Sequence, residues 1–297
     1  MTQATFDTPH QSPVVPNLLS TEAVIQFDCH KGITCFNECC RHADITLTPY
    51  DILRLKQHLE ISTTEVLARH TVPFEMDASG MPGIKLKTTD EKPVCLFMTD
   101  AGCSVYEDRP SACRYYPVGL LSMHKTGQAG EEQHYCLVEE NHCMGHKEAR
   151  KLTIGEYRKE QGVEIYDDMN YEWYQIILKK RSSGPAVGKP SPTSFQFFFM
   201  CSYDMDRFRK FVLTDSFKAT YDLDQTTFEG LAKDDVALLK FSYRLMKQVF
   251  FGEESIPMRL GALEERIEKR KPVLEMRRQL EIELHKQKDD PYQQADA

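Results

Sequence analysis

The sequence lacks the features that mark several common classes of protein. Its N-terminus has no basic start followed by an apolar run, as a secretory signal peptide would. No segment approaches the roughly 18 consecutive apolar residues that a membrane helix requires. Walker loops, G-x-G-x-x-G fingerprints, H-E-x-x-H motifs and nucleophile elbows are also missing. We therefore expect an intracellular, cytoplasmic protein with no membrane partner, whose chemistry uses none of these motifs.

Positive charge is also in short supply. The chain has 37 Lys and Arg against 45 Asp and Glu, which gives a formal net charge of -8. Such a surface does not attract phosphate backbones, so nucleic acid is not an expected partner, and a protein partner stays open. With 297 residues, 41% of them hydrophobic, the chain is long enough for one large domain or two modest ones.

Cysteine is scarce in the second half of the chain and abundant in the first. Nine of the ten cysteines lie between Cys29 and Cys143, and only Cys201 lies beyond them. In a reducing compartment, clustered thiols favour metal or redox chemistry over disulfides. Zinc and iron-sulfur clusters are the centres that thiolates typically hold. The first half is therefore predicted to be a metal-binding module, whereas Cys201 is expected to be a small core residue in an apolar strand.

The spacing of the nine cysteines is unusual. It runs C-x5-C-x3-C-C, then C-x7-C-x9-C, then C-x6-C, which matches neither zinc ribbons nor bacterial ferredoxins. Cys39 and Cys40 are adjacent, and neighbours in an extended segment point to opposite sides, so we expect them to serve different roles or different metal atoms. Nine thiols would supply two four-ligand sites with one thiol left over, or one cluster plus several structural thiols. The spacing of the cysteines does not distinguish these two arrangements.

Basic residues lie close to these cysteines in the sequence. Four thiolates around a divalent zinc or a 4Fe-4S core in its 2+ state leave a net charge near -2, which needs compensation. The candidates for this role around a bound cofactor are Lys31, Arg41, Arg109 and Arg114. Arg109 has an alternative, since it could pair with Glu107 or Asp108 on the surface.

Histidines and tyrosines also flank the cysteines. The histidines are His30, His42, His142 and His146. They could complete a site, but each is expected to be a polar loop residue. Tyr115 and Tyr116 are expected to pack over the metal and limit the access of solvent.

The sequence predicts an α+β fold, mainly α, in which an irregular cysteine-rich module with short strands precedes a helical region with an aromatic core. The predicted division is a flexible leader at 1–22, a cysteine-cluster metal-binding domain at 23–180, a Gly, Pro and Ser-rich linker at 181–194, a helical C-terminal region at 195–288 and a disordered tail at 289–297.

Capping and turn signals predict the individual elements. Strands are expected at 23–28 and 195–203, and a hairpin within 74–88. A turn is expected at Asp100-Ala101-Gly102, so that Cys95 and Cys103 flank a tight loop and face each other. Helices are expected at 49–59, after Ser62, from Pro110 to Cys113, after Thr153, over 171–180, after Asp204 or Asp206, and over 234–251 with Gly252 as the C-cap. The end of the chain is expected to form a solvated surface helix.

Two stretches resemble a known family. They are CHKGITCFNECC at 29–40 and CLFMTDAGCSVYEDRPSACRYYP at 95–117. Over roughly residues 25–145 the chain resembles the YkgJ-type cysteine-cluster family, bacterial proteins with a zinc- or iron-chelating domain. The resemblance implies metal ligands at Cys29, Cys35, Cys39, Cys40, Cys95, Cys103 and Cys113, with Cys136 and Cys143 as additions.

The predicted cofactor is a 4Fe-4S cluster, because an odd number of thiols, an adjacent pair and nearby bases suit a large anionic centre. Zinc is the alternative. The expected role is structural, redox or sensory, without enzyme activity. A related cysteine motif occurs in flagellin lysine methylases, which are thought to use an iron-sulfur cluster in methyl transfer. A protein lysine methyltransferase is therefore the second hypothesis, although no methyl-donor motif is visible.

Overall fold

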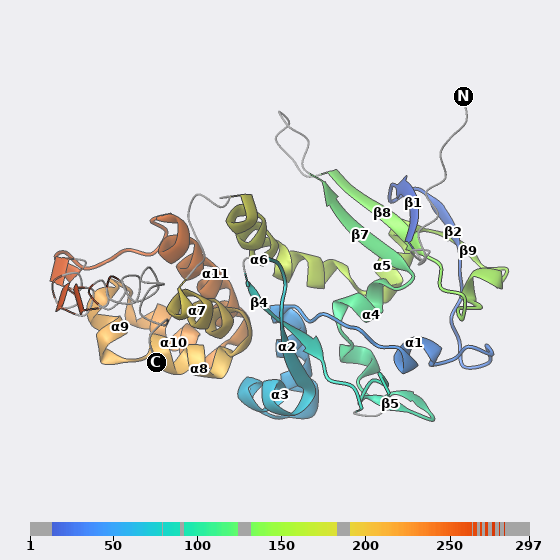
Figure 1. The fold of residues 1–297 in the computed structure, drawn as a ribbon, viewed down its shortest axis with the longest axis horizontal. Helices are drawn as coiled ribbons and strands as arrows, with labels where there is room; N and C mark the ends of the chain where they lie inside the picture. The colour runs from blue at the N-terminus through green and yellow to red at the C-terminus, as the bar shows by residue number, and fades with distance from the viewer. Residues whose placement is uncertain are drawn as a thin grey trace, which may run out of the picture.

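A computed structural model describes residues 14–78, 80–89, 92–123, 132–182 and 191–262, with isolated helical positions between 264 and 282. The chain is a mainly helical α+β protein with short strands in small sheets, as the sequence predicts. Figure 1 shows strands β1, β7 and β8 at one end and the C-terminal helices at the other, with helix α6 (Glu164–Ser182) running between them. Within these ranges, no helix has both the length and the apolar character needed to cross a membrane.

The largest sheet is antiparallel and has the order β1-β8-β7. Its strands are β1 (Val14–Leu19), β7 (Val118–Met123) and β8 (Glu132–Val138). The prediction of a flexible leader is wrong for 14–19, because this segment pairs with β8. The pairing register shifts between Val15 and Leu19, where Pro16 offers no amide hydrogen, and an edge strand tolerates such an interruption. Residues 1–13 of the leader lie outside the described residues.

A smaller core lies beneath this sheet. The predicted strand at 23–28 forms as β2 (Val24–Gln26), which pairs antiparallel with β9 (Lys151–Thr153). Thr153 then caps α5 (Ile154–Gln161) in a reciprocal box with Glu156, so the predicted helix start is confirmed. The buried residues of this smaller core are Ile25, Phe27, Tyr115, Val118, Tyr135, Leu152, Ile154, Tyr157 and Val163.

Two capped helices and a hairpin follow the first cysteines. Helix α2 (Pro49–Leu59) begins with a capping box between Thr48 and Asp51, and α3 (Thr63–His70) with one between Ser62 and Glu65. Strands β3 (Thr71–Glu75) and β4 (Pro82–Leu86) pair antiparallel. Both helices and the hairpin are confirmed, because each has a local signal that its own segment supplies.

The remaining short elements surround the cysteines. They are α1 (Glu38–Arg41), β5 (Met98–Thr99), β6 (Gly102–Cys103), η1 (Tyr106–Asp108), α4 (Ser111–Tyr115) and η2 (Gly145–Lys147). Strands β5 and β6 form a tight hairpin around the predicted turn at Asp100. Helix α4 begins after Pro110 and includes Cys113, as predicted.

The described part of the C-terminal region is mainly helical. Its helices are α7 (Pro192–Tyr203), α8 (Met205–Val212), α9 (Asp215–Thr220), α10 (Gln225–Lys233) and α11 (Asp235–Phe251). Asp204 caps α8, and Gly252 ends α11 in the left-handed conformation, both as expected. The described positions between 264 and 282 are helical and exposed, whereas the predicted tail at 289–297 lies outside the described residues.

The predicted strand at 195–203 is wrong, because this segment forms helix α7. Ser191 accepts a hydrogen bond from the Ser194 amide, and Pro192 occupies the first turn, so a local cap starts the helix. The aromatic residues of 195–199 can follow one another closely because α6 and α11 pack on different sides of this helix. Phe198 stacks on Trp173 of α6, and Phe197 contacts Phe250 of α11.

The larger core joins both halves of the chain. It combines buried side chains of α2 and β4 with those of α6, α7, α8 and α11. It therefore takes residues from both sides of the predicted linker at 181–194. Of that linker, 181–182 belong to α6 and 192–194 to α7, and 183–190 lie outside the described residues.

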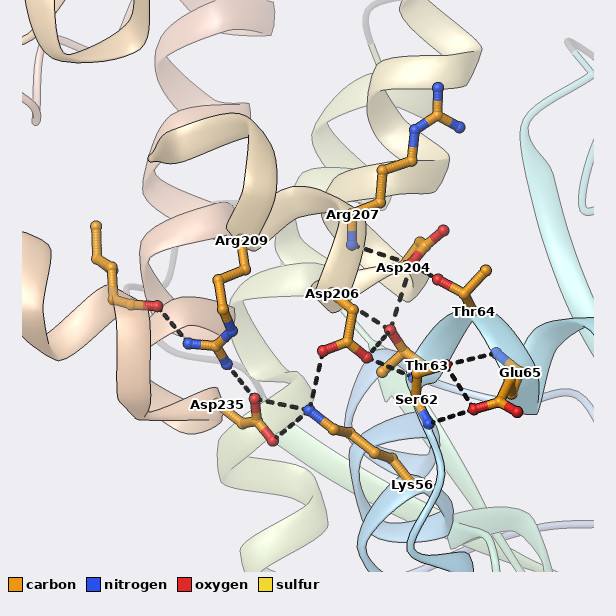
Figure 2. A network of polar contacts seen from close by, with 11 residues as sticks. Lys56, Ser62, Thr63, Thr64, Glu65, Asp204, Asp206, Arg207, Arg209 and Asp235 are labelled. Carbon is orange, nitrogen blue, oxygen red and sulfur yellow. Dashed lines mark hydrogen bonds and ion pairs between the residues drawn. The ribbon is translucent and has the colours of Figure 1, made fainter. Parts of the chain in front are cut away.

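A polar network also fastens the two halves together (Figure 2). Lys56 of α2 binds Asp206 of α8 at 3.2 Å and Asp235 of α11 at 2.9 Å. The amide of Thr63 donates to Asp206 at 2.6 Å, and Arg209 pairs with Asp235. These ion pairs and hydrogen bonds fix α2 and α3 against α8 and α11, so the cysteine module and the helical region share one interface.

Candidate metal centre

All ten cysteines are described and all are free thiols. Among the described residues, no three Cys, His, Asp or Glu side chains form a ready-made metal site. Eight of the thiols nevertheless gather around helix α1, in two groups that contact different cores.

The first group, called here the small-core thiols, consists of Cys29, Cys35 and Cys143. Two hydrogen bonds bring their segments together. The amide of Asp28 donates to the carbonyl of Gly145 at 3.2 Å, and the amide of Met144 donates to Cys35 Sγ at 3.2 Å. Cys143 packs against the smaller core.

The electrostatics of Cys29 agree with this arrangement. Burial raises the pKa of the Cys29 thiol, and nearby Cys39, Cys35 and Cys143 raise it further, to about 11. A neighbouring thiolate raises a thiol pKa because it disfavours a second negative charge. The charges of Cys35 and Cys143 therefore act on Cys29.

The second group, called here the large-core thiols, consists of Cys40, Cys95, Cys103 and Cys113. The amide of Cys95 donates to the carbonyl of Cys40 at 2.8 Å. The β5-β6 hairpin pairs Met98 with Cys103 and so returns the chain towards Cys95. Cys95 belongs to the larger core, and Cys40 and Cys103 pack against it.

Burial and mutual repulsion act on the large-core thiols as well. Burial raises the pKa of Cys113, and the thiolates of Cys95 and Cys103 add to the shift. Burial also raises the pKa of Cys95, with a further contribution from Cys103. The predicted juxtaposition of Cys95 and Cys103 across a tight loop is confirmed.

Cys39 lies between the two groups. The predicted extended conformation at Cys39 and Cys40 is wrong, because both belong to α1, where neighbouring side chains diverge by about 100° rather than 180°. A hydrogen bond from the Cys40 thiol lowers the pKa of Cys39 to about 7, and the same bond raises the pKa of Cys40. Burial is the largest cause of the raised pKa values of Cys29 and Cys95. The Cys39 thiolate contributes to both shifts.

Cys136 and Cys201 lie outside both groups. Cys136 is buried in β8, and its thiol donates to the carbonyl of Gly119 across the sheet at 3.7 Å. Cys201 is a core residue, as expected, but it lies in helix α7 and not in a strand.

Asp51 supports the position of Cys113, a role the sequence prediction missed. Its buried carboxylate accepts hydrogen bonds from the amides of Thr48 and Ser111, each at 2.8 Å. Burial raises the pKa of Asp51, and these hydrogen bonds oppose the rise. Ser111 begins helix α4, so Asp51 fastens α2 to the helix that carries Cys113. The only signal in the sequence is the spacing from Thr48 to Asp51, typical of a capping box.

The predicted basic partners behave differently from one another. Arg109 is buried and donates to the carbonyl of Tyr106 and to Gln161. Burial raises the pKa of Cys103, and the charge of Arg109 opposes this rise. Arg114 is buried too, but it donates to the backbone carbonyls of Arg109, Glu107 and Gln161 and so organises the loop.

The other two bases lie at the surface. Arg41 pairs with Glu38 at 3.0 Å, and Lys31 is exposed. The predicted surface pairing of Arg109 with Asp108 does not form, since Asp108 binds Arg54 and His58 instead.

The histidines mostly have partners of their own. His146 contacts the carbonyl of Val138, and His30 accepts a hydrogen bond from the amide of Gly32. The rings of His42 and His142 are tilted by 41° with their centroids 6.1 Å apart.

The two tyrosines after Cys113 have separate roles. Burial raises the pKa of Tyr116, and its contact with Cys143 adds to the shift, so Tyr116 packs beside the small-core thiols as predicted. Tyr115 instead enters the smaller core and donates to Asp167 at 2.6 Å.

Comparison with known proteins agrees with the sequence over the cysteine module. Residues 28–144 match a family model described as a "putative zinc- or iron-chelating domain". The match confirms the resemblance to the cysteine-cluster family for this segment, and it spans every cysteine of both thiol groups. No curated protein and no solved structure matches the chain.

Proposed function

We propose that the cysteine module holds metal, as an iron-sulfur cluster of the 4Fe-4S type in preference to zinc, and serves a structural, redox or sensory role. The observation that carries this proposal is the gathering of eight free thiols around α1 from segments far apart in the chain. The match to a zinc- or iron-chelating domain supports metal binding without choosing the metal.

The donor set fits a metal on chemical grounds. Burial and mutual repulsion keep most of these thiols protonated, whereas a bound cation deprotonates a coordinating thiol. Since no three side chains form a ready-made site among the described residues, we infer that thiol side chains rotate onto the metal when it binds.

Several groups of the chain would stabilise thiolates in a loaded site. The Met144 amide already donates to Cys35 Sγ, and the charge of Arg109 acts on Cys103. Hydrogen bonds to sulfur and nearby positive charge tune the reduction potential of iron-sulfur clusters. These contacts support the preference for a cluster, because its reduction potential responds to them, whereas zinc has no redox chemistry to tune.

Solvent access supports a redox or sensory role over a purely structural one. Cys29 and Cys39 are exposed, although their neighbours are partly buried. A centre that includes these sulfur atoms would be within reach of oxidants or of an electron-transfer partner. Free thiols at all ten positions also suit a reducing compartment, so we propose a cytoplasmic location.

The test is elemental analysis of the full chain purified anaerobically, together with its visible spectrum and acid-labile sulfide. We expect brown protein with iron and sulfide in equal amounts. Colourless protein with stoichiometric zinc would overturn the choice of cluster, and protein without bound metal would overturn the proposal. Cys201→Ala is the matched control, because this buried thiol lies in α7, which is well separated from α1 in Figure 1, and its loss should leave the metal content unchanged.

Protein lysine methylation remains the second hypothesis. It requires a methyl donor close to the thiols. The open cavity between the ends of α6 and α11 is lined by residues such as Ile176, Lys179, Lys247 and Phe251, and none of the clustered cysteines belongs to it. Titration of the metal-loaded protein with S-adenosylmethionine in a calorimeter tests the hypothesis, and absence of heat with a fully loaded centre would reject it.

A further inference from the structure

Members of the two thiol groups pack against different cores. Cys143 packs against the smaller core, beside β7 and β8. Cys95 is part of the larger core, and Cys40 and Cys103 pack on its surface. A single four-sulfur centre has room for one group, so the other would remain without a metal.

The chain segments that supply the groups are also joined by separate hydrogen bonds. On one side, Met144 binds Cys35 Sγ, and Asp28 binds Gly145. On the other side, the amide of Cys95 binds the carbonyl of Cys40. The Asn37 side chain, just before α1, donates to the carbonyl of Thr99 at 3.2 Å in the β5-β6 hairpin. Each group therefore has its own backbone support.

Helix α1 divides the adjacent pair between the groups. Cys40 packs with the larger core and is bound through its carbonyl to Cys95, so it belongs to the large-core thiols. That group then contains four sulfur atoms without Cys39. The small-core thiols number three, and Cys39, exposed like Cys29, is the thiol of α1 that remains. A second four-sulfur set is complete only when Cys39 joins the small-core thiols.

We propose, on the basis of the function proposed above, that the module contains two four-thiol centres that meet at the Cys39-Cys40 turn. The small-core centre takes Cys29, Cys35, Cys39 and Cys143. The large-core centre takes Cys40, Cys95, Cys103 and Cys113. Cys136, buried in β8 and bound to Gly119, is the leftover ninth thiol and ligates neither.

The two centres have different surroundings. The large-core centre has a buried thiol in Cys95, the charge of Arg109 near Cys103, and Asp51 supporting the helix of Cys113. The small-core centre includes the exposed Cys29 and Cys39. A chelator in solution should therefore remove metal from the small-core centre first.

The experiment measures metal per chain in the full-length protein, in three single serine variants and in one double variant. Wild type should hold two centres, which means about eight iron atoms or about two zinc ions. Cys143→Ser and Cys113→Ser should each lose about half of the metal, and the double variant nearly all of it. Cys136→Ser is the matched control, a buried cysteine of the same module, and should keep the full content.

Amide hydrogen exchange gives a second readout that does not depend on metal content. Cys143→Ser should raise exchange in the segment around Gly145, whereas Cys113→Ser should raise it in the β5-β6 hairpin and α4. Circular dichroism of each variant shows whether the helices persist. The wild-type stoichiometry needs no variant, so the test holds even where a substitution prevents folding.

The outcomes separate this inference from the proposed function. Wild type without metal would overturn both. Wild type with metal for a single centre would leave the proposed function intact and overturn the pair of centres. The pair would also be overturned if Cys143→Ser or Cys113→Ser lost all metal while still folded, or if Cys136→Ser lost half of it.

Discussion

Cys39 should be the most reactive thiol of the metal-free module, and Cys29 offers a matched comparison. Both residues keep part of their surface exposed to solvent. Hydrogen bonding from Cys40 lowers the pKa of Cys39 to about 7. In contrast, partial burial of its thiol and the neighbouring thiolates raise the pKa of Cys29 to about 11. At pH 7 about half of Cys39 is thiolate, against about one part in 10,000 of Cys29.

The expected ratio of rates is smaller than the ratio of thiolate fractions. Intrinsic nucleophilicity falls with pKa at a Brønsted slope of about 0.4–0.5, so four pKa units cost Cys39 about 40- to 100-fold. The thiolate advantage of about 5,000-fold then leaves Cys39 about 50- to 130-fold faster than Cys29 at pH 7. As pH rises, the rate at Cys39 should level off above about 8, whereas the rate at Cys29 should continue to rise towards pH 11.

The assay is alkylation of anaerobic, metal-free protein by iodoacetamide over a range of pH, followed by quenching and peptide mass spectrometry. Cys40→Ala removes the hydrogen-bond donor and should slow alkylation of Cys39 at pH 7. Equal rates at Cys39 and Cys29, or no effect of Cys40→Ala, would refute the assignment of the thiolate to Cys39.

Two further predictions concern the supports of the module. In Asp51→Asn, an amide donor replaces one of the carboxylate oxygens that accept from the amides of Thr48 and Ser111. The free energy of unfolding, measured with urea, should therefore fall by about 1–3 kcal/mol. Asp44→Asn is the control, because Asp44 is exposed and its substitution should change stability little. Lys56→Met leaves the carboxylates of Asp206 and Asp235 facing each other, and because all three groups keep some contact with solvent the loss should be about 1–2 kcal/mol. The exposed pair of Lys271 supplies the control, since Lys271→Met should alter stability by under about 0.5 kcal/mol. Unchanged unfolding in either core variant would contradict the corresponding contact.

The elements that the sequence predicts well are those with local signals. Thr48, Ser62 and Thr153 each cap a helix within three residues of their partner, and Gly252 ends α11 where a left-handed residue is required. The cysteine module is also visible in sequence, because an excess of thiols in one half needs no knowledge of the fold. The helix boundaries are predictable because each depends on residues only a few positions apart in the sequence.

The errors arise where distant segments decide the structure. Strand β1 forms because 14–19 pairs with β8, more than a hundred residues later. The aromatic run of α7 suggests a strand, since a short apolar run in sequence does not distinguish a buried helix from a buried strand. The buried contacts of Arg114 with three carbonyls, and the division of the thiols between two cores, likewise depend on tertiary packing.

Helix α6 shows why the thiols are available for a metal and are not needed to hold the cores together. Its first turn is tied to the smaller core by Asp167, which binds Tyr115 of that core and Arg158 of α5, each at 2.6 Å. Its buried side chains, among them Trp173 and Ile176, belong to the larger core. One continuous helix therefore connects the two cores without any contribution from the clustered cysteines. Metal binding can then order the segments that carry these cysteines around α1 while the rest of the fold stays in place.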